Sequence, residues 1–399
     1  MLEIPFVREP RADELSIIPR WGQTASKILT VIKENGTVAK ERLAQITGYS
    51  SGTINAQLSM LKRARLVRYV GKTDNLDQSS NPTPTASDTV PKLKMRLITW
   101  EEYRQYVEKK KFVTIEGVNI EVGKSHRISM YGPPRSYEPE TTTVWSFPNR
   151  GDWATHAGDY RGNWSPYVPR NLILKYSKLR EVVLDQMVGS GTTLVEAKLL
   201  GRNAIGVDIN YEACILAMDR LNFDYTPLDN QTPVEIKVYH GDAAHLDAIN
   251  DNSIDLIATH PPYWNIIPYS EERHAADLSN MRTLDAYLEK MREIASESFR
   301  VLKPGRYCAI LIGDTRRHKH YVPISARVMM VFLKAGFILA EDIIKLQHKM
   351  KTTRELWRAQ RFETYGFHKV VHEHLYIFRK PTSKAEYSKL KLSTSFDEA

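Results

Sequence analysis

Apolar residues change their spacing along the second half of the chain, which distinguishes predicted strands from predicted helices. The stretch EVVLD is a short run that ends at Asp185, and the residues after Gly191 have apolar positions at helical spacing. A second short run ends at Asp208, and IDLIAT, residues 254–259, forms a third. Short β-branched runs indicate buried strands, and the 3.6-residue spacing indicates the helix between them. The pattern predicts strand, tight loop, helix and strand, as in α/β proteins.

The N-terminal part has three short apolar faces, separated by Gly36 and Gly48. The faces consist of Ile28, Leu29 and Ile32, then Leu43 and Ile46, then Ile54, Leu58 and Leu61. Followed by the strand-like RLVRYV, they predict a winged helix-turn-helix domain at 20–72. Its third helix, about 51–63, would enter the major groove of DNA and present Thr53, Asn55, Gln57 and Lys62. Dimerisation or protein docking is the alternative use of such a domain.

Two further segments separate this domain from the α/β pattern. Residues 73–91 are polar and contain prolines but almost no apolar side chains, so a flexible linker is expected. Residues 92–143 form an accessory region with a helix near TWEEYRQYVEKKK and a strand-like FVTIEGVNIEVG. The sequence indicates no purpose for this region.

Composition narrows the class of protein. The chain has 399 residues, 42% of them hydrophobic, enough for one large core and smaller modules. Its two cysteines form no CxxC pair, so neither a disulfide framework nor structural zinc is expected. Because no apolar run reaches membrane-span length and no secretory leader is visible, we expect a soluble cytoplasmic protein. The net charge of +9 favours a polyanionic partner such as nucleic acid, although a generically basic protein is the alternative.

The loop between the first strand and its helix carries the first candidate chemistry. Gly189-Ser190-Gly191 allows a ligand to approach the backbone, and the helix that follows offers free amides. Asp208, at the end of the next strand, is placed to accept hydrogen bonds from both ribose hydroxyls. These features indicate a nucleoside pocket. A dinucleotide-binding fold is similar, but its GxGxxG spacing is absent.

The second motif, His260-Pro261-Pro262-Tyr263, follows the predicted strand 254–259. Open α/β sheets bind ligands at such strand ends. The two prolines fix the backbone, an aromatic ring held there can stack on a base, and carbonyl groups can accept hydrogen bonds from an exocyclic amine. Methylation of a base amino group requires these properties.

Together these motifs resemble the S-adenosylmethionine-dependent DNA amino-methyltransferases of the N4-cytosine/N6-adenine family. LDQMVGSGTT resembles the family's cofactor motif, with Asp185-Gln186-Met187 where DPF is usual, and THPPYW resembles its catalytic motif. FPNRGDWATHAGDYRGNWSPYVPRNLILKYS resembles the segment that closes over the cofactor, and RVLKPGRYCAILIGD, AGFILAEDII and HEHLYIFRK resemble its later strands. The resemblance implies a Rossmann-like, seven-stranded class I methyltransferase domain at 144–382, followed by a flexible tail at 383–399.

The resemblance also implies residue roles. S-adenosylmethionine is the expected cofactor and no metal is expected; the residues implied for the cofactor are Asp185, Gly189, Ser190, Gly191, Thr192, Asp208, Asp242 and His156. Pro261 and the neighbouring carbonyls would orient the target amine, and Tyr263 would stack on the flipped base. His156 belongs to a cluster in the segment that closes over the cofactor, where a packed structural turn is the alternative: Asp152, Trp153, His156, Arg161, Asn163 and Trp164.

His260 departs from the family pattern, which has Asp or Asn in adenine-N6 members and Ser in cytosine-N4 members at this position. The absence of an acid, together with Trp264 after the tyrosine, favours cytosine N4 slightly. Adenine N6 stays open.

The expected partner is double-stranded DNA, in a cytoplasmic protein of prokaryotic or phage type. The basic, aromatic stretch 345–361 is placed like a DNA-contacting insertion, although a solvated helix face explains the charges nearly as well. Its candidate contacts are Lys349, Lys351, Arg354 and Arg358. A restriction-modification system with a separate nuclease chain is one biological setting in which such a protein would act. The alternative functions are an RNA or tRNA base methyltransferase and a DNA-binding regulator with an inactive methyltransferase fold.

Overall fold

The computed structural model describes most of the chain in two compact units, residues 1–87 and 88–399. The described residues are 3–5, 22–35, 37–50, 53–54, 57–58, 61, 93–225, 233–264, 277–348 and 366–394. None of the described helices is long and apolar enough to cross a membrane.

Among the described residues of the N-terminal unit are the helices α2 (Gly22–Asn35) and α3 (Lys40–Thr47) and a strand pair. β1 (Glu3–Pro5) pairs antiparallel with β2 (Thr37–Ala39). Residues from the three expected apolar faces form one buried cluster: Ile28, Leu29, Ile32, Leu43, Ile54, Leu58 and Leu61. Ile46 does not join it, because its side chain is 41% exposed; the expectation for that residue was wrong. The expected wing strand, RLVRYV, and the linker 73–91 lie outside the described residues.

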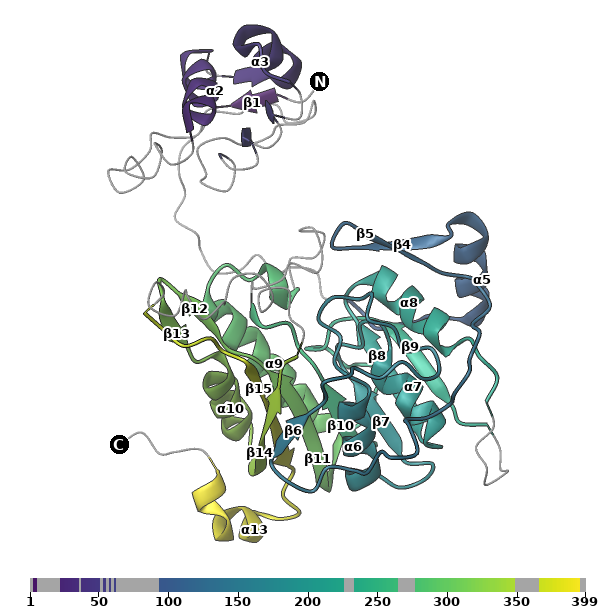
Figure 1. The fold of residues 1–399 in the computed structure, drawn as a ribbon. Helices are drawn as coiled ribbons and strands as arrows, with labels where there is room; N and C mark the ends of the chain where they lie inside the picture. Colours follow the sequence, from purple (N-terminus) through teal and green to yellow (C-terminus); the bar gives the residue numbers. More distant parts are fainter. Residues whose placement is uncertain are drawn as a thin grey trace. The chain divides into compact units, whose positions relative to one another are not determined.

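The C-terminal unit is built on a nine-stranded sheet with the order β3-β9-β8-β7-β10-β11-β15-β14-β6 (Figure 1). The inner strands are β7 (Val182–Asp185), β8 (Asn203–Asp208), β9 (Ile236–His240), β10 (Ile254–Thr259), β11 (Leu302–Ile312), β14 (Ile338–Leu346) and β15 (His372–Arg379). β15 runs antiparallel to both its neighbours, while the others run parallel. The edges are β3 (Arg96–Leu97) and β6 (Val144–Ser146). The seven inner strands are the class I methyltransferase sheet that the sequence predicted.

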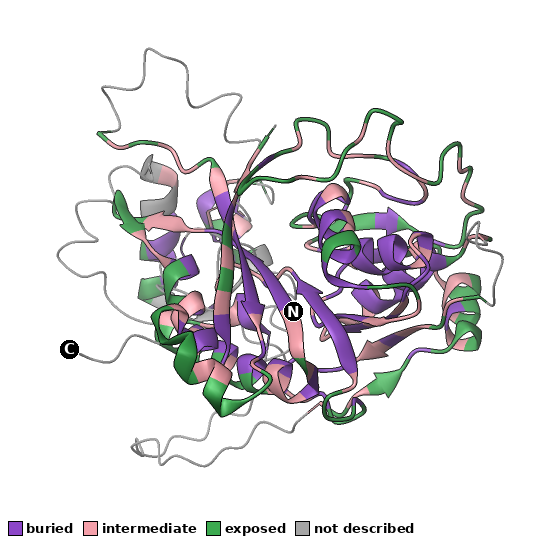
Figure 2. Cartoon of the chain, turned by 90° about the horizontal axis from the view of Figure 1, so that it is seen from below, coloured by how far each residue is buried: buried purple, intermediate pink, exposed green. Residues whose placement is uncertain are grey.

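Alternate residues of the inner strands face two separate cores, since side chains alternate along a strand. In β10, Leu256 and Ala258 belong to one core, and Ile257 between them belongs to the other. The first core is completed by α6 (Tyr167–Tyr176), α7 (Thr192–Leu199) and α8 (Tyr211–Leu221), the second by α9 (Leu284–Val301) and α10 (Ile324–Lys334). Figure 2 shows buried residues concentrated in the sheet and in the helix faces toward it. The result is a three-layer α/β/α unit.

The accessory region packs on α8. It consists of α5 (Trp100–Lys109) and the hairpin of β4 (Phe112–Ile115) and β5 (Val118–Glu121), which confirms the expected helix and strand-like stretch. The buried Tyr103 hydroxyl donates to Asp219 Oδ1 at 2.7 Å, and the Lys110 ammonium lies 2.6 Å from Glu212 Oε1. Both acids belong to α8, so this region covers the outer side of the helix.

The C-terminal segment differs from the expected flexible tail. Residues 384–389 form α13 (Lys384–Lys389), and a 3₁₀ turn, η5 (Lys391–Ser393), follows. The Ser383 side chain accepts from the Glu386 amide at 3.2 Å, which is an N-cap hydrogen bond. The Glu386 carboxylate also pairs with Arg379 at the end of β15. Capping and this ion pair order residues 383–394, so the expectation of a flexible tail was wrong for this part.

Candidate active site

The loop between β7 and α7 depends on two glycines with positive φ, Gly189 (50°) and Gly191 (83°). A Cβ at Gly189 would lie 3.1 Å from the Tyr160 ring, and one at Gly191 would lie 3.1 Å from Ala217 of α8. Gly189, Ser190 and Thr192 line a cavity, but Gly191 does not. Gly191 therefore supports the site through close helix packing rather than by facing a ligand.

Asp185 ties the ends of two neighbouring strands together. Its Oδ2 accepts from the Thr193 hydroxyl at 2.5 Å, and its Oδ1 accepts from the Thr259 hydroxyl at 2.8 Å. Burial raises the pKa of Asp185 to about 6, although these hydrogen bonds oppose the shift. The carboxylate holds the glycine loop against the end of β10.

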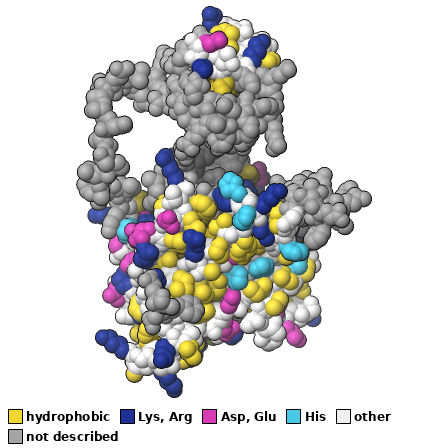
Figure 3. Space-filling model, turned by 90° about the vertical axis from the view of Figure 1, so that its left-hand side faces the viewer, with side chains coloured by type: hydrophobic (Ala, Val, Ile, Leu, Met, Phe, Trp, Pro, Cys, Tyr) yellow, Lys and Arg dark blue, Asp and Glu magenta, His cyan; other side chains and the backbone are white. Residues whose placement is uncertain are grey.

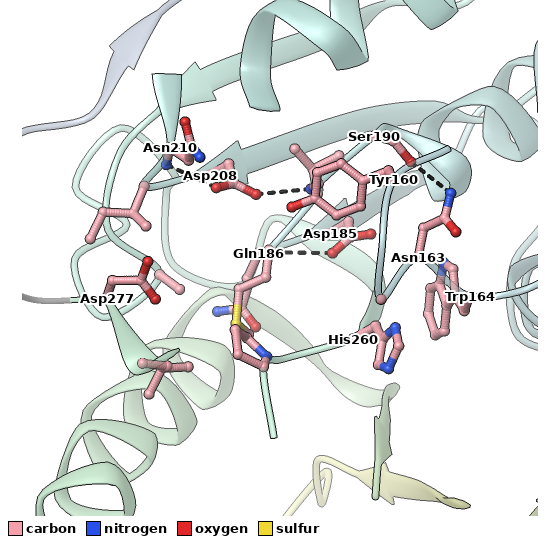
Figure 4. Close-up of a pocket in the computed structure, with 18 of the residues that line it drawn as sticks. Tyr160, Asn163, Trp164, Asp185, Gln186, Ser190, Asp208, Asn210, His260 and Asp277 are labelled. Atoms are coloured by element: carbon pink, nitrogen blue, oxygen red, sulfur yellow. Dashed lines mark hydrogen bonds between the residues drawn. The ribbon is translucent and has the colours of Figure 1, made fainter. Parts of the chain in front are cut away.

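Asp208 ends β8 and faces the cavity (Figure 4). The amide of Gly189 donates to its Oδ2 at 2.8 Å, and the amide of Asn210 donates to its Oδ1 at 2.9 Å. Burial raises the pKa of Asp208 to about 7; the two backbone donors oppose this, whereas the charges of Asp277 and Asp185 add to it. A hydroxyl donor from a ligand would stabilise the ionised form.

The cavity encloses about 820 Å³, including its open mouth. Its walls come from the loops after β7, β8, β9 and β10 and from the segment before α6. From that last segment, Tyr160 and Trp164 supply aromatic surface, and the Asn163 amide donates to Ser190 Oγ at 3.1 Å. Apolar walls with a few fixed polar groups are typical of small-molecule sites.

Asp242 follows β9 and also lines the cavity, as expected. Its Oδ2 lies 2.8 Å from the Lys290 ammonium of α9, and its Oδ1 accepts from the Ala244 amide at 2.9 Å. Each carboxylate oxygen can still accept a second hydrogen bond. The lysine thus fixes a hydrogen-bond acceptor in the cavity wall.

The motif His260-Pro261-Pro262-Tyr263 lies directly after β10, and His260 and Pro262 line the same cavity. The Tyr263 ring does not; it lies over Gly313, where a Cβ would come within 2.5 Å of the ring. The Tyr263 hydroxyl donates to Glu373 Oε1 at 2.6 Å and lies 2.5 Å from His260 Nε2. The tyrosine is therefore held in a fixed position at the edge of the cavity.

His260 is a neutral imidazole enclosed by aromatic rings. Its ring stacks on Trp164 with a centroid distance of 5.7 Å and an interplanar angle of 18°. Burial lowers the pKa of His260 to about 4, although the Glu373 carboxylate opposes this shift. Protonation near neutral pH is thus strongly disfavoured.

The Pro262 carbonyl of the motif is less available to a substrate amine than the sequence suggested. The Pro262 carbonyl accepts from the Tyr287 hydroxyl of α9 at 2.9 Å and from the Trp264 amide at 3.0 Å. Because these two donors already bind the Pro262 oxygen, the Pro261 carbonyl is the better candidate to orient an amine. Pro261 itself is not among the residues that line the cavity. Hydrogen bonds within the protein therefore hold the Pro262 end of the double proline in place.

His156 is not part of the cavity, so the structure contradicts its expected contact with a cofactor. Its Nε2 lies 2.7 Å from Glu196 Oε1, which also accepts from the Trp153 indole at 2.6 Å; Arg170 donates to the second carboxylate oxygen at 2.9 Å. Glu196 belongs to α7 and is fully buried. The charge of a buried carboxylate requires such partners, so His156 and Trp153 form the structural turn, whereas Asn163 and Trp164 face the cavity.

The expected DNA contacts are only partly described. Thr53 is exposed and Gln57 is half-buried in the N-terminal unit. Asn55, Lys62, Lys349, Lys351, Arg354 and Arg358 lie outside the described residues. Within the described part of the chain, no group of three or more acidic, histidine or cysteine side chains is arranged to hold a metal ion.

Sequence reasoning missed several residues of the site. The buried Asp277 lines the cavity near Asp208, and Gln186 lines it from the position where the family pattern has proline (Figure 4). Lys290 lies 48 residues from its partner Asp242, and Glu373 lies 110 residues from its partner Tyr263. Glutamine in place of the family's proline at position 186 was a signal that the sequence alone contained. No neighbouring residues in the sequence indicated a role for Asp277, Lys290 or Glu373.

A protein-family model described as DNA methylase matches residues 77–219 and 254–398, well over half of the chain. The chain is 28% identical over 156 residues to the type II beta methyltransferase M.BslI of Bacillus sp. (strain NEB-606), covering 36% of this chain and 16% of that protein. It is 33% identical over 113 residues to the type II methyltransferase M.BglII of Bacillus subtilis, covering 27% of this chain and 28% of that protein. The chain thus spans well under half the length of these relatives.

Two of the solved structures that are similar to this chain match about half of it. An S-adenosylmethionine-dependent methyltransferase from Methanosarcina mazei is 18% identical, with a TM-score of 0.37, over 53% of this chain and 97% of that one. TrmN from Thermus thermophilus is 17% identical, with a TM-score of 0.34, over 55% of this chain and 50% of that one.

Proposed function

The chain belongs to the DNA methylase family, and on that premise we propose that it transfers a methyl group from S-adenosylmethionine to the exocyclic amine of a base in double-stranded DNA. One observation carries this proposal. Asp208 and the glycine loop line the same cavity as His260 and Pro262. A nucleoside-binding carboxylate and an amine-orienting motif at one cavity are the two parts that such a transfer requires.

The cavity has unmet hydrogen-bonding capacity that suits S-adenosylmethionine, the cofactor of this family. Gln186 Oε1 accepts from the Ser298 hydroxyl at 2.8 Å, but its buried Nε2 has no partner among the described residues. A buried donor without a partner is costly, and it belongs to a residue that lines the cavity. In this proposal Asp208 would hold the ribose hydroxyls, and Asp242, which Lys290 contacts, would accept from the adenine amine.

The residues of the motif would position the base rather than remove its proton first. When bound, S-adenosylmethionine supplies the electrophilic methyl group. The target base would leave the helical stack, with its amine near the Pro261 carbonyl and its ring against Tyr263, which Glu373 holds in place. Neutral His260 is a weak base, so the amine proton would leave after methyl transfer rather than before it.

We assign cytosine N4 as the target amine in preference to adenine N6. The first motif position carries His260 instead of an acid or amide, and its ring lies on Trp164, with Nε2 near Tyr263. The side chain therefore braces the aromatic residues of the site. A separate restriction nuclease as partner, and DNA binding by the N-terminal unit through Thr53 and Gln57, complete the proposal.

The test is expression in a host that lacks DNA methylation, followed by mass spectrometry of genomic nucleosides. N4-methylcytosine is the expected product, and the Asp208→Asn variant serves as the inactive control. N6-methyladenine would overturn the choice of base but not of reaction. If neither modified base appears while purified protein still binds the cofactor, methyl incorporation into tRNA decides between an RNA substrate and an inactive fold.

A further inference from the structure

A strongly basic β-hairpin follows β11 at the edge of the candidate site. It consists of β12 (Thr315–Arg317) and β13 (His320–Val322), joined by the two-residue turn His318-Lys319. The hairpin contains three Lys or Arg residues and two histidines but no acidic residue, and residues 317–321 are exposed. Figure 3, which views the side where the hairpin lies in Figure 1, shows histidine, lysine and arginine side chains gathered on this face.

The turn is built from residues that are unfavourable for its geometry. His318 and Lys319 have φ values of 49° and 69°. Two-residue hairpin turns with two positive φ values normally contain asparagine and glycine, since other side chains are strained there. Backbone strain of this kind is concentrated at functional sites in proteins. The two residues of this turn are a histidine and a lysine, so the tip carries the Lys319 charge.

The base of the hairpin is anchored, so the tip is held rigidly. Asp314 accepts from the Ser325 amide at 2.7 Å and also from the Tyr321 hydroxyl, which joins the two ends of the hairpin. Arg316 donates to the His368 carbonyl at 2.8 Å and lies 4.8 Å from the centre of the Phe367 ring. These contacts occupy Arg316. The exposed positive charges of the hairpin are those of Arg317 and Lys319, and Lys319 lies in the turn at its tip.

The hairpin adjoins the loop that carries the motif. Gly313, which supports the Tyr263 ring, lies two residues before β12. The Arg317 guanidinium lies 5.2 Å from the centre of the Trp264 ring, within the range of a cation–π interaction. The indole of Trp264 donates to the Met281 carbonyl at 3.0 Å. Arg317, the residue before the turn, thus holds the hairpin against the loop that follows the motif.

We propose that the tip of the β12–β13 hairpin binds the phosphate backbone of duplex DNA beside the target base. In the described part of the chain, no carboxylate lies within ion-pair distance of the Lys319 ammonium, so its charge is available to a phosphate. Phosphate contacts set the register of a protein on DNA without reading its sequence. The inference rests on the proposed DNA substrate and adds the surface that positions it.

The decisive variant is Lys319→Glu, because it reverses the charge at the tip. The matched control is Lys389→Glu, on an exposed lysine of α13 at the far end of the unit from the hairpin (Figure 1). Affinity for an unmethylated duplex is measured by fluorescence anisotropy at several salt concentrations, and cofactor binding by calorimetry reports on folding. Lys319→Arg tests for rescue by charge alone.

We expect Lys319→Glu to weaken duplex binding by about tenfold or more, to raise KM for DNA and to reduce the salt slope by about 0.9 for each phosphate that the variant no longer neutralises. Lys319→Arg and Lys389→Glu should bind like the parent protein. Unchanged affinity and salt slope in Lys319→Glu, while the parent protein methylates DNA, would overturn the hairpin inference and leave the proposed function standing. A parent protein that neither binds nor methylates duplex DNA would overturn both.

Discussion

The Tyr263 hydroxyl lies 2.6 Å from Oε1 of Glu373, a residue 110 positions later in the chain. β15 brings Glu373 to this point by inserting antiparallel between β11 and β14. Burial raises the pKa of Glu373, but the Lys345 ammonium, 2.8 Å from its Oε2, together with His260 and the Tyr263 hydroxyl outweighs this, so the pKa lies below its ordinary value. An ionised, buried carboxylate thus anchors the aromatic ring of the motif.

Tyr263→Phe tests this anchor. The change removes the hydroxyl that joins His260 and Glu373 and leaves a buried carboxylate without one of its donors. Because a hydrogen bond to a charged group contributes about 1.5–3 kcal/mol, kcat should fall by about tenfold or more while cofactor affinity stays the same. Single-turnover kinetics and calorimetry measure the two quantities. Tyr387→Phe on α13 is the control. An unchanged kcat in Tyr263→Phe would show that the hydrogen bond to Glu373 has no role in catalysis.

The rate should not depend on His260 titration near neutral pH. Burial lowers the pKa of His260 to about 4, so the ring is neutral above that pH in the folded protein. Between about pH 5.5 and 8, kcat should therefore show no inflection that disappears in His260→Ala. The variant itself should turn over more slowly, since Trp164 and Tyr263 lose their common neighbour, with cofactor affinity little altered. An inflection near pH 6.5 that the substitution abolishes would make His260 an acid–base catalyst instead.

Asp208→Asn should weaken cofactor binding and change the dependence of stability on pH. The folded-state pKa of Asp208 is raised to about 7, above the ordinary value of 3.8. The unfolded chain therefore loses this proton first, and the stability that the protonated group contributes below about pH 4 is lost as pH rises toward 7. In cofactor-free protein, the melting temperature of Asp208→Asn should therefore rise relative to that of the parent protein as pH increases over this range.

The matched control for this comparison is Asp285→Asn, at an exposed position in the first turn of α9. Its melting temperature should follow the parent protein across the same pH range. Calorimetry should show weaker cofactor binding for Asp208→Asn only. Parallel melting curves for Asp208→Asn and the parent protein would show that the Asp208 carboxyl has an ordinary pKa.

Gly191→Ala should destabilise the fold through packing and backbone conformation. Its φ of 83° disfavours alanine by roughly 1–2 kcal/mol, and the added Cβ would lie 3.1 Å from the Cα of Ala217. The free energy of unfolding from urea titration should fall by at least about that amount. Gly158→Ala, whose Cβ would come no closer than 3.7 Å to its nearest neighbour, is the control. Equal stability of the two variants would contradict the packing role of Gly191.

Local sequence patterns predicted the central part of the site well. Strand, tight loop and helix around Gly189 and Gly191, and the acid at the end of the next strand, follow from apolar spacing and backbone sterics, which act over a few residues. They placed Asp208, Asp242 and His260 at the same edge of the sheet, where the structure has them. His156 could not be placed in this way, because Glu196, the partner that turns it away from the cavity, lies 40 residues later.

By itself, the sequence determined the order of strands and helices, the residues of both motifs and the edge of the sheet at which they meet. Only the tertiary structure decided the partners of the residues at this edge: Glu373 for Tyr263, Lys290 for Asp242, and Tyr287 for the Pro262 carbonyl. The physical reason is that apolar periodicity is a local property, read within one element. Buried polar groups take their hydrogen-bond partners from whichever strand or helix the packed sheet brings alongside.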